Sequence, residues 1–107
     1  MAIEVSADTF EQEVVQSETP VLVDFWGPRC VPCLALMPEV EKLVEKYGEK
    51  LKVTTVDASK NRRLCINLKV INLPTYLYYK NGKEVDRLKG DGLTIEDVEG
   101  AVKKMLG

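Results

Sequence analysis

The hydrophobic positions of this chain follow two periods, one typical of a buried strand and one typical of a helix. Val21 to Trp26 is apolar except for Asp24, the pattern of a parallel strand covered on both faces. Between Cys30 and Tyr47 the apolar residues recur at i, i+4, i+7, i+8 and i+11, which predicts a helix with one buried face. We expect Gly48 to end this helix and Pro38 to kink it. The residues of the repeat are Leu36, Val40, Leu43, Val44 and Tyr47.

The remaining elements are shorter, and caps and turns define them. Asp8 with Glu11, and Thr94 with Asp97, have the three-residue spacing of a capping box, so each pair is expected to start a helix. Asn81-Gly82 lies between two segments suited to strands and predicts a tight hairpin. In chain order, these elements are a strand at 3–5, a helix at 8–16, a strand at 51–56, a short helix at 61–68, strands at 75–79 and 84–88, and a helix from 94 to about 105.

This order of elements predicts an α/β fold. Strands that are linked by helices come out parallel, whereas the hairpin adds an antiparallel pair. We therefore expect a mixed central sheet of about five strands flanked by four helices, in a single domain that spans residues 1–107.

Composition and charge narrow the class of protein. Hydrophobic residues make up 45% and charged residues 30% of the chain, which is ordinary for a soluble globular protein. A net charge of −2 provides no attraction to nucleic acid or to an anionic membrane. The N-terminus lacks a basic start followed by an apolar core, and the longest apolar run contains Asp24, so we expect no signal peptide and no membrane span. Three cysteines do not make a secreted disulfide framework, and we expect a cytoplasmic monomer whose resting state is a dithiol.

The candidate chemistry lies at Cys30-Val31-Pro32-Cys33, between the strand at 21–26 and the long helix. Three residues of helical rise put both sulfurs on one side of the first turn, within the Cα separation that a disulfide tolerates. The free N–H groups and the positive end of the helix dipole stabilise a thiolate on Cys30. A buried cysteine pair or half of a zinc site is the alternative, but the chain has no histidine and only one further cysteine, Cys65, so a Cys/His zinc site within it is excluded. Cys65 itself is expected to be a small core residue.

Asp24 is the second residue with a chemical interpretation. Strand alternation groups it with Leu22 and Trp26, and both faces of this strand should be buried. A buried carboxylate without a partner is kept protonated by a raised pKa, and thiol–disulfide exchange needs a group that accepts and returns a proton. With no histidine in the chain, Asp24 is the best available base. The alternative is that Asp24 lies on a wetter strand end and has no role.

Three further features each have two interpretations. Pro74 precedes the fourth strand, and local sequence favours an ordinary turn proline because only about one X–Pro bond in twenty is cis in folded proteins. Arg29 is either a solvated loop charge or a cation that favours the Cys30 thiolate. A basic cluster at the start of the short helix is interpreted as a solvated face, with a surface for an acidic partner as the second interpretation: Lys60, Arg62 and Arg63.

Together these motifs resemble the thioredoxin family over nearly the full chain. The resemblance implies a thioredoxin fold in which Cys30 is the exposed nucleophile, Cys33 the buried resolving thiol and Asp24 the buried proton-transfer carboxylate. It also implies that Pro74 is cis and packs against the dithiol, with the neighbouring backbone pairing with an extended substrate segment. The groove would be bordered by Trp26, Arg29, Val31, Pro32, Leu73, Pro74, Thr75 and Gly90. The residues that carry the resemblance are Val21-Leu22-Val23-Asp24-Phe25-Trp26, Cys30-x-Pro32-Cys33, Pro38, Leu73-Pro74-Thr75, Tyr79-Lys80-Asn81-Gly82 and Gly90.

The function that the resemblance implies is protein dithiol–disulfide oxidoreductase. Disulfide-containing target proteins would be reduced, a thioredoxin reductase that is flavin-dependent or ferredoxin-linked would supply the electrons, and no cofactor would be bound beyond the redox-active Cys30–Cys33 pair. A more oxidising disulfide isomerase and a non-catalytic binding subunit with the same fold remain the alternatives.

The chain departs from the common form of this family at five positions. Arg29 replaces a tryptophan, Val31 a glycine, Leu34 a lysine, Thr55 a lysine near the buried carboxylate, and Asn72 a glycine. The recognition rim and the electrostatics of Asp24 therefore differ from the common form. The Cys-Val-Pro-Cys centre resembles thioredoxins associated with anaerobic amino-acid fermentation, which serve reductases such as glycine reductase.

Overall fold

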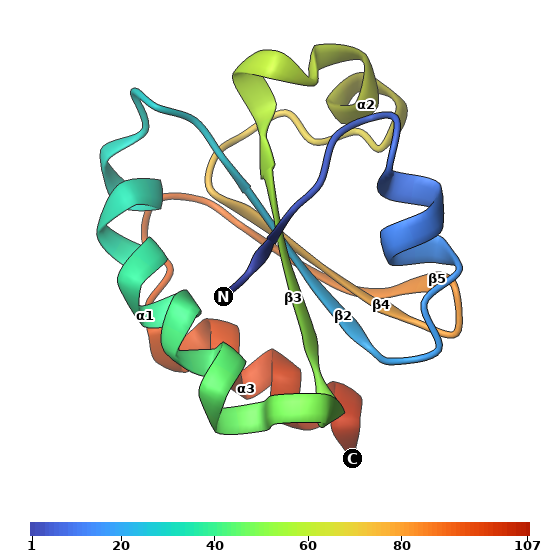
Figure 1. Cartoon of the computed structure of the whole chain (residues 1–107). Coiled ribbons are helices and arrows are strands. Elements are labelled where there is room, and N and C mark those ends of the chain that lie inside the picture. The colour runs from blue at the N-terminus through green and yellow to red at the C-terminus, as the bar shows by residue number, and fades with distance from the viewer.

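Five strands form one mixed sheet in the order β1-β3-β2-β4-β5 in the computed structural model, which describes residues 1–107 (Figure 1). β1 and β2 both pair with β3 in parallel, whereas β4 pairs antiparallel with β2 and with β5. The expected mixed sheet is therefore confirmed, with β2 at its centre. The strands are β1 (Ile3–Glu4), β2 (Val21–Trp26), β3 (Lys52–Asp57), β4 (Thr75–Lys80) and β5 (Lys83–Lys89).

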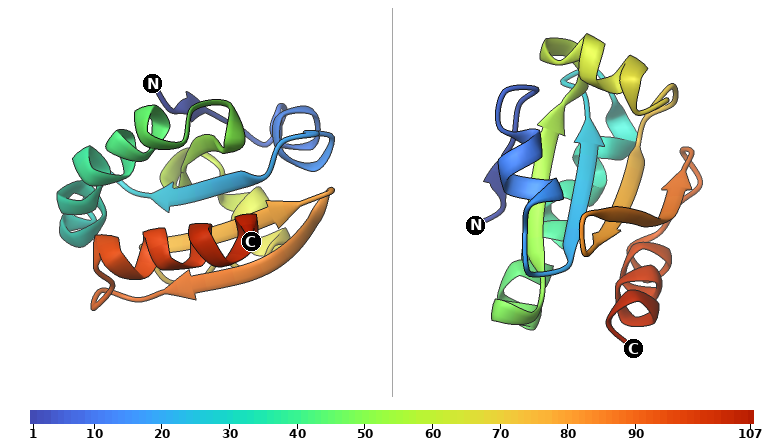
Figure 2. Two further views of the ribbon diagram at one scale, coloured as in Figure 1. Left: turned by 90° about the horizontal axis from the view of Figure 1, so that it is seen from below. Right: turned by 90° about the vertical axis from the view of Figure 1, so that its right-hand side faces the viewer.

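Helices cover both faces of this sheet. α1 and α3 pack on one face and contact each other, while η1 and α2 lie on the opposite face (Figures 1 and 2). α1 continues through Pro38, so the expected kink stays a prediction. No helix combines the length and the apolar character needed to cross a membrane. The helices are η1 (Glu11–Val15, a π-helix), α1 (Val31–Tyr47), α2 (Arg62–Asn67) and α3 (Ile95–Leu106), with the short 3₁₀ turns η2 (Gly48–Lys50) and η3 (Ala58–Lys60).

β2 contributes to two separate hydrophobic clusters, one on each face of the sheet. Leu22 packs with Val40 of α1 and Val98 of α3. Val23 and Phe25 point the other way, into the cluster covered by η1 and α2. All five residues are buried. The sequence pattern of a strand covered on both faces is thus confirmed, and β2 is held rigidly from both sides.

The Asn81-Gly82 hairpin also forms as expected. Asn81 and Gly82 have φ angles of 54° and 79°, the two positive values that a type I′ turn requires. A Cβ on Gly82 would lie 2.9 Å from the carbonyl oxygen of Val15, so a larger residue would collide with the backbone at the end of η1. Glycine at this position therefore serves both the turn and its packing.

The expected capping box at Asp8 and Glu11 is wrong. The turn begins earlier, because the carbonyl of Ser6 accepts hydrogen bonds from the N–H groups of Thr9 and Phe10. The Ser6 N–H in turn donates to the Thr9 hydroxyl at 3.0 Å. These contacts provide hydrogen-bond partners for the backbone groups at the start of the turn, and Asp8 is left exposed. The helix that follows is the short π-helix η1.

The second capping box, at the start of α3, is confirmed. The Asp97 N–H donates to the Thr94 hydroxyl at 3.2 Å, and the Thr94 N–H donates to the Asp97 carboxylate at 3.0 Å. Thr94→Ala is expected to lower the free energy of unfolding by about 1 kcal/mol, measured by urea denaturation, because it leaves the Asp97 N–H without its side-chain partner. Thr94→Ser keeps the hydroxyl and should restore most of the loss. Equal losses for alanine and serine would contradict a capping role.

Candidate active site

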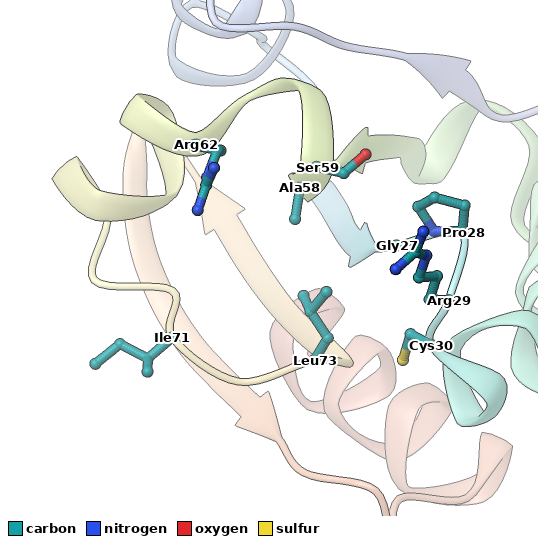
Figure 3. Close-up of a pocket in the computed structure, with 9 residues that line it drawn as sticks. All are labelled: Gly27, Pro28, Arg29, Cys30, Ala58, Ser59, Arg62, Ile71 and Leu73. Atoms are coloured by element: carbon teal, nitrogen blue, oxygen red, sulfur yellow. The ribbon is translucent and has the colours of Figure 1, made fainter.

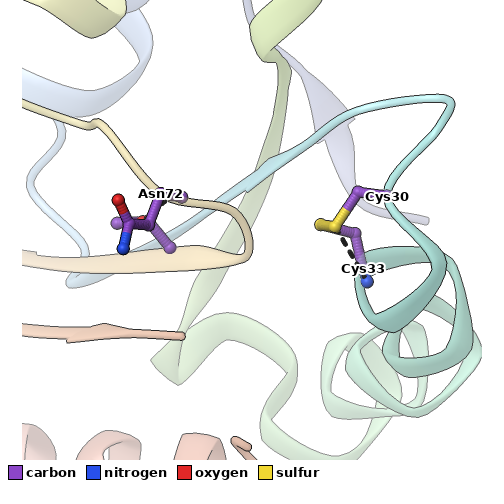
Figure 4. Close-up of a disulfide and its surroundings, with 4 residues drawn as sticks. Cys30, Cys33 and Asn72 are labelled. Atoms are coloured by element: carbon purple, nitrogen blue, oxygen red, sulfur yellow. Dashed lines mark hydrogen bonds between the residues drawn. A yellow bond between two sulfur atoms is a disulfide. The ribbon is translucent and has the colours of Figure 1, made fainter. Parts of the chain in front are cut away.

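The two cysteines lie at the N-terminus of α1, directly after the loop that leaves β2. Cys30 is the N-cap residue, and its sulfur accepts a hydrogen bond from the N–H of Cys33 at 3.3 Å (Figure 4). The two sulfurs are joined in a disulfide of 2.12 Å, with 5.2 Å between the Cα atoms. Cys33 has no exposed surface, whereas Cys30 is partly exposed. The pairing of these sulfurs at the first helical turn is therefore confirmed, and only one of them reaches solvent.

Asp24 lies in the centre of the sheet and is 1% exposed. Neither of its carboxylate oxygens has a hydrogen-bond partner in the protein. Burial raises the pKa of Asp24 to about 7, because an isolated charge is costly away from water. The alternative of a wet strand end is wrong, and the expectation of a raised pKa is confirmed.

The strand neighbours of Asp24 explain why nothing offsets its burial. Thr55 of β3 and Tyr76 of β4 are its register partners, and neither side chain carries a charge at neutral pH. The Tyr76 hydroxyl and the Trp26 indole N–H are also buried without partners. The pKa of Tyr76 lies above its usual value, first because of burial and then because of the nearby Asp24 carboxylate. The surroundings of Asp24 thus contain no cation that would lower its pKa.

The segment before β4 is fixed against the ends of β2 and β5. The Leu73–Pro74 peptide bond is cis, as the resemblance implies, so the ordinary turn proline favoured by local sequence is wrong. The Gly90 N–H donates to the Pro74 carbonyl at 3.1 Å, and the Thr75 hydroxyl donates to the Asn72 carbonyl at 2.5 Å. A Cβ on Gly27 would lie 3.2 Å from Leu73 Cδ1, so glycine allows Leu73 to approach the end of β2.

A cleft of about 800 Å³ opens between this segment and the sulfur of Cys30 (Figure 3). Of the groove residues expected from sequence, Arg29 and Leu73 line it together with Cys30. The other expected groove residues do not line it: Trp26, Val31, Pro32, Pro74, Thr75 and Gly90. The residues that sequence reasoning did not assign to the groove are Gly27, Pro28, Ala58, Ser59, Arg62 and Ile71.

The parallel pairing of β2 and β3 explains part of this difference. The carboxyl ends of parallel neighbours meet at one edge of a sheet, and crevices form there. Trp26 ends β2 opposite Asp57, which ends β3, so Ala58 and Ser59 follow β3 into the same edge as Cys30. That signal was present in the sequence. The position of Ile71 had no such signal, because it depends on the path of the loop before Pro74.

The third cysteine does not join this site, and no cluster of side chains could hold a metal ion. Cys65 is buried in the cluster under η1 and α2, as expected for a small core residue, and burial raises the pKa of its thiol. No group of three or more histidine, cysteine, aspartate or glutamate side chains is arranged to hold a metal ion.

Comparison with known proteins agrees with this geometry. The family model described as Thioredoxin matches residues 1–104. The chain belongs to the thioredoxin family. It is similar to a thioredoxin of Acetoanaerobium sticklandii, with 46% identity over 96% of this chain and 98% of the relative. A thioredoxin of Peptoclostridium acidaminophilum is 39% identical over 100% of this chain and 97% of its own, and thioredoxin 1 of a Nostoc species is 38% identical over 83% of each.

As a thioredoxin-family member with a closely spaced cysteine pair, the protein is a dithiol–disulfide oxidoreductase. The surface beside the cysteine pair carries two exposed apolar side chains. Val31, which replaces the usual glycine, is 76% exposed, and Leu34, which replaces a lysine, is 44% exposed. Both lie in the first turn of α1, where they flank the buried Cys33 in sequence.

Proposed function

We propose that Cys30 attacks the target disulfide and that Cys33 completes the exchange. The Cys30 thiolate would form a mixed disulfide with one target sulfur and release the other as a thiolate. Cys33, deprotonated, would then attack the Cys30 sulfur, form the Cys30–Cys33 disulfide and release the second target thiolate. Two electrons pass to the target, and two protons complete its thiols. The partial exposure of Cys30 and the full burial of Cys33 support this order.

We assign the proton transfer at Cys33 to Asp24. The chain has no histidine, and the pKa of Asp24 is raised to about 7, so its carboxylate can accept a thiol proton and return it near neutral pH. Asp24 shares the face of β2 that carries Leu22, and Leu22 packs against α1, the helix that contains Cys33.

The segment from Leu73 to Thr75 is proposed to pair with the target backbone. The hydrogen bond from Gly90 and the contact with Gly27 fix this segment beside the cleft that Cys30 shares. An extended target chain would lie against it, with Trp26, Arg29, Val31, Pro32 and Gly90 at the border of the contact.

The source of electrons and the cellular setting complete the proposal. A thioredoxin reductase, flavin-dependent or ferredoxin-linked, would regenerate the dithiol, and the protein would work in the cytoplasm as a monomer of one domain. Targets would include reductases of the kind that serve anaerobic amino-acid fermentation, because the Cys-Val-Pro-Cys centre and the rim depart from the common pattern.

Alkylation of the reduced protein tests the assignment of the nucleophile. Iodoacetamide at mildly acidic pH is expected to label Cys30 first, because Cys30 alone combines exposure with helix N-terminal N–H groups and a neighbouring arginine. Peptide mass mapping locates the label. Earlier labelling of Cys33 or Cys65 would overturn the assignment. Reduction of insulin disulfides by the same dithiol form should also occur, whereas a binding subunit would not perform it.

A further inference from the structure

Two arginines line the cleft beside Cys30. Arg29 comes from the loop between β2 and α1, and Arg62 from the first residue of α2. Figure 3 shows their side chains on opposite walls, with Leu73 between them. Both are exposed, and neither belongs to any of the ion pairs of the protein. Their charges are therefore available to a molecule that enters the cleft.

No carboxylate among the lining residues opposes these charges. The whole chain has a net charge of −2, so the cleft is locally positive on a slightly acidic protein. Asp57 directly precedes the lining residues Ala58 and Ser59, but it is buried, and its Oδ1 accepts hydrogen bonds from the N–H and the hydroxyl of Ser59. The cleft therefore favours an anionic group over a neutral or cationic one.

Apolar side chains make up most of the rest of the lining, which suits a peptide. Ile71 is 88% exposed and Leu73 half-buried, and Pro28 and Ala58 line the cleft with them. An exposed apolar side chain in the same cleft as two arginines outside any ion pair matches a chain that carries both apolar and acidic residues. A guanidinium presents two parallel N–H donors to a carboxylate, which makes arginine a selective partner for aspartate or glutamate.

We propose that this cleft binds an extended segment of the target protein that carries a carboxylate within a few residues of the reactive cysteine. The target carboxylate would lie between Arg29 and Arg62, with an apolar neighbour against Leu73 and Ile71, while its disulfide faces the Cys30 sulfur. The proposal rests on the proposed function, since it places the target cysteine at Cys30. It makes Arg62, on a helix remote in sequence from Cys30 and Cys33, a residue that determines specificity.

Disulfide-linked peptides that differ in one residue provide the test. Three peptides carry glutamate, glutamine or lysine beside the cysteine, and kcat/KM is measured for each at low ionic strength. Two exposed ion pairs correspond to a preference of about two- to thirtyfold for the glutamate peptide over the glutamine peptide. This ratio should fall in Arg62→Gln and at high salt. Arg62→Glu places a negative charge opposite Arg29, so the rates for the glutamate and the lysine peptides should become nearly equal.

Arg63→Gln is the matched control, because Arg63 is the next residue of the same helix, is exposed and does not line the cleft. It should keep the glutamate preference of the unchanged protein. Equal rates for the three peptides, or the same loss of preference in Arg63→Gln as in Arg62→Gln, would overturn the proposal. Hydroxyethyl disulfide, which is neutral, distinguishes failure of the cleft proposal from failure of the proposed function. If the protein reduces this compound but shows no peptide preference, only the cleft proposal fails. If the protein reduces no disulfide at all, the proposed function fails.

Discussion

Cys33→Ser is expected to stop turnover with protein disulfides and to leave Cys30 joined covalently to its targets. The first attack needs only the partly exposed Cys30, whereas release of the target needs the buried thiol of Cys33. Serine is close to cysteine in size, so the packed start of α1 should be retained. Insulin turnover should fall to the background rate, and intact-mass measurement should detect a mixed disulfide at Cys30.

Two further variants define what this result means. Cys30→Ser should neither turn over nor trap a target, because the attacking sulfur is absent. Cys65→Ala should behave like the unchanged protein, since Cys65 lies in the core cluster under α2 and outside the site. Turnover in Cys33→Ser, or a target trapped on Cys65, would contradict the proposed division of roles. A trapped complex would also supply natural target segments in which to look for the acidic residue that the cleft favours.

The features that could be predicted from sequence are those with a local physical cause. The unbroken apolar run of β2 required cover on both faces, and Asn81-Gly82 required a turn with two positive φ angles. Cys30 and Cys33 are brought together by one turn of helix, so their pairing needed no knowledge of the rest of the chain. Burial of Asp24 followed from the same strand pattern, and its raised pKa followed from burial.

The features that could not be predicted depend on contacts between distant segments. Local sequence alone favours an ordinary turn proline at Pro74, and only the resemblance to the family implies the cis bond that the structure has. The segment's partners, Gly27 and Gly90, lie far from it in sequence. The sequence favours a solvated face for Arg62, with a surface for an acidic partner as the second interpretation, because its position opposite Arg29 depends on how α2 packs. The capping box expected at Asp8 does not form for a local reason. Ser6 and Thr9 make the hydrogen bonds at the start of this turn in place of Asp8.

Asp24→Asn is expected to stabilise the protein at alkaline pH and to slow its reaction. The folded-state pKa of Asp24 is about 7, against an ordinary value of 3.8. Below about pH 4 the carboxyl is protonated in both the folded and the unfolded chain, so it imposes no penalty. As pH rises from about 4 through 7, the unfolded chain ionises first, and the free energy of unfolding falls. The full penalty is reached above pH 7, and a shift of about three pKa units corresponds to about 4 kcal/mol.

Asparagine replaces the carboxyl with a neutral amide of similar shape, so this pH dependence should disappear. Urea denaturation at pH 8 should show a gain in stability of up to about 4 kcal/mol over the unchanged protein, and at pH 4 the two should differ by less than about 1 kcal/mol. The rate of disulfide exchange near pH 7 should fall by up to about 10²-fold, the lower end of what a general base contributes.

Tyr76→Phe is the matched control for the stability measurement. It removes the unpartnered hydroxyl of Tyr76, the register partner of Asp24 on β4, and the phenol carries no charge at these pH values. Any change in the stability of Tyr76→Phe should therefore be equal at pH 4 and pH 8. The comparison separates the effect of removing an unpartnered buried group from the effect of removing an ionisable one. If Asp24→Asn gave the same gain at both pH values, the carboxyl would already be ionised in the folded protein at low pH. If Asp24→Asn and the unchanged protein had the same exchange rate between pH 6 and 8, Asp24 would not carry the proton for Cys33. Another path for the proton from that buried thiol to solvent would then have to exist.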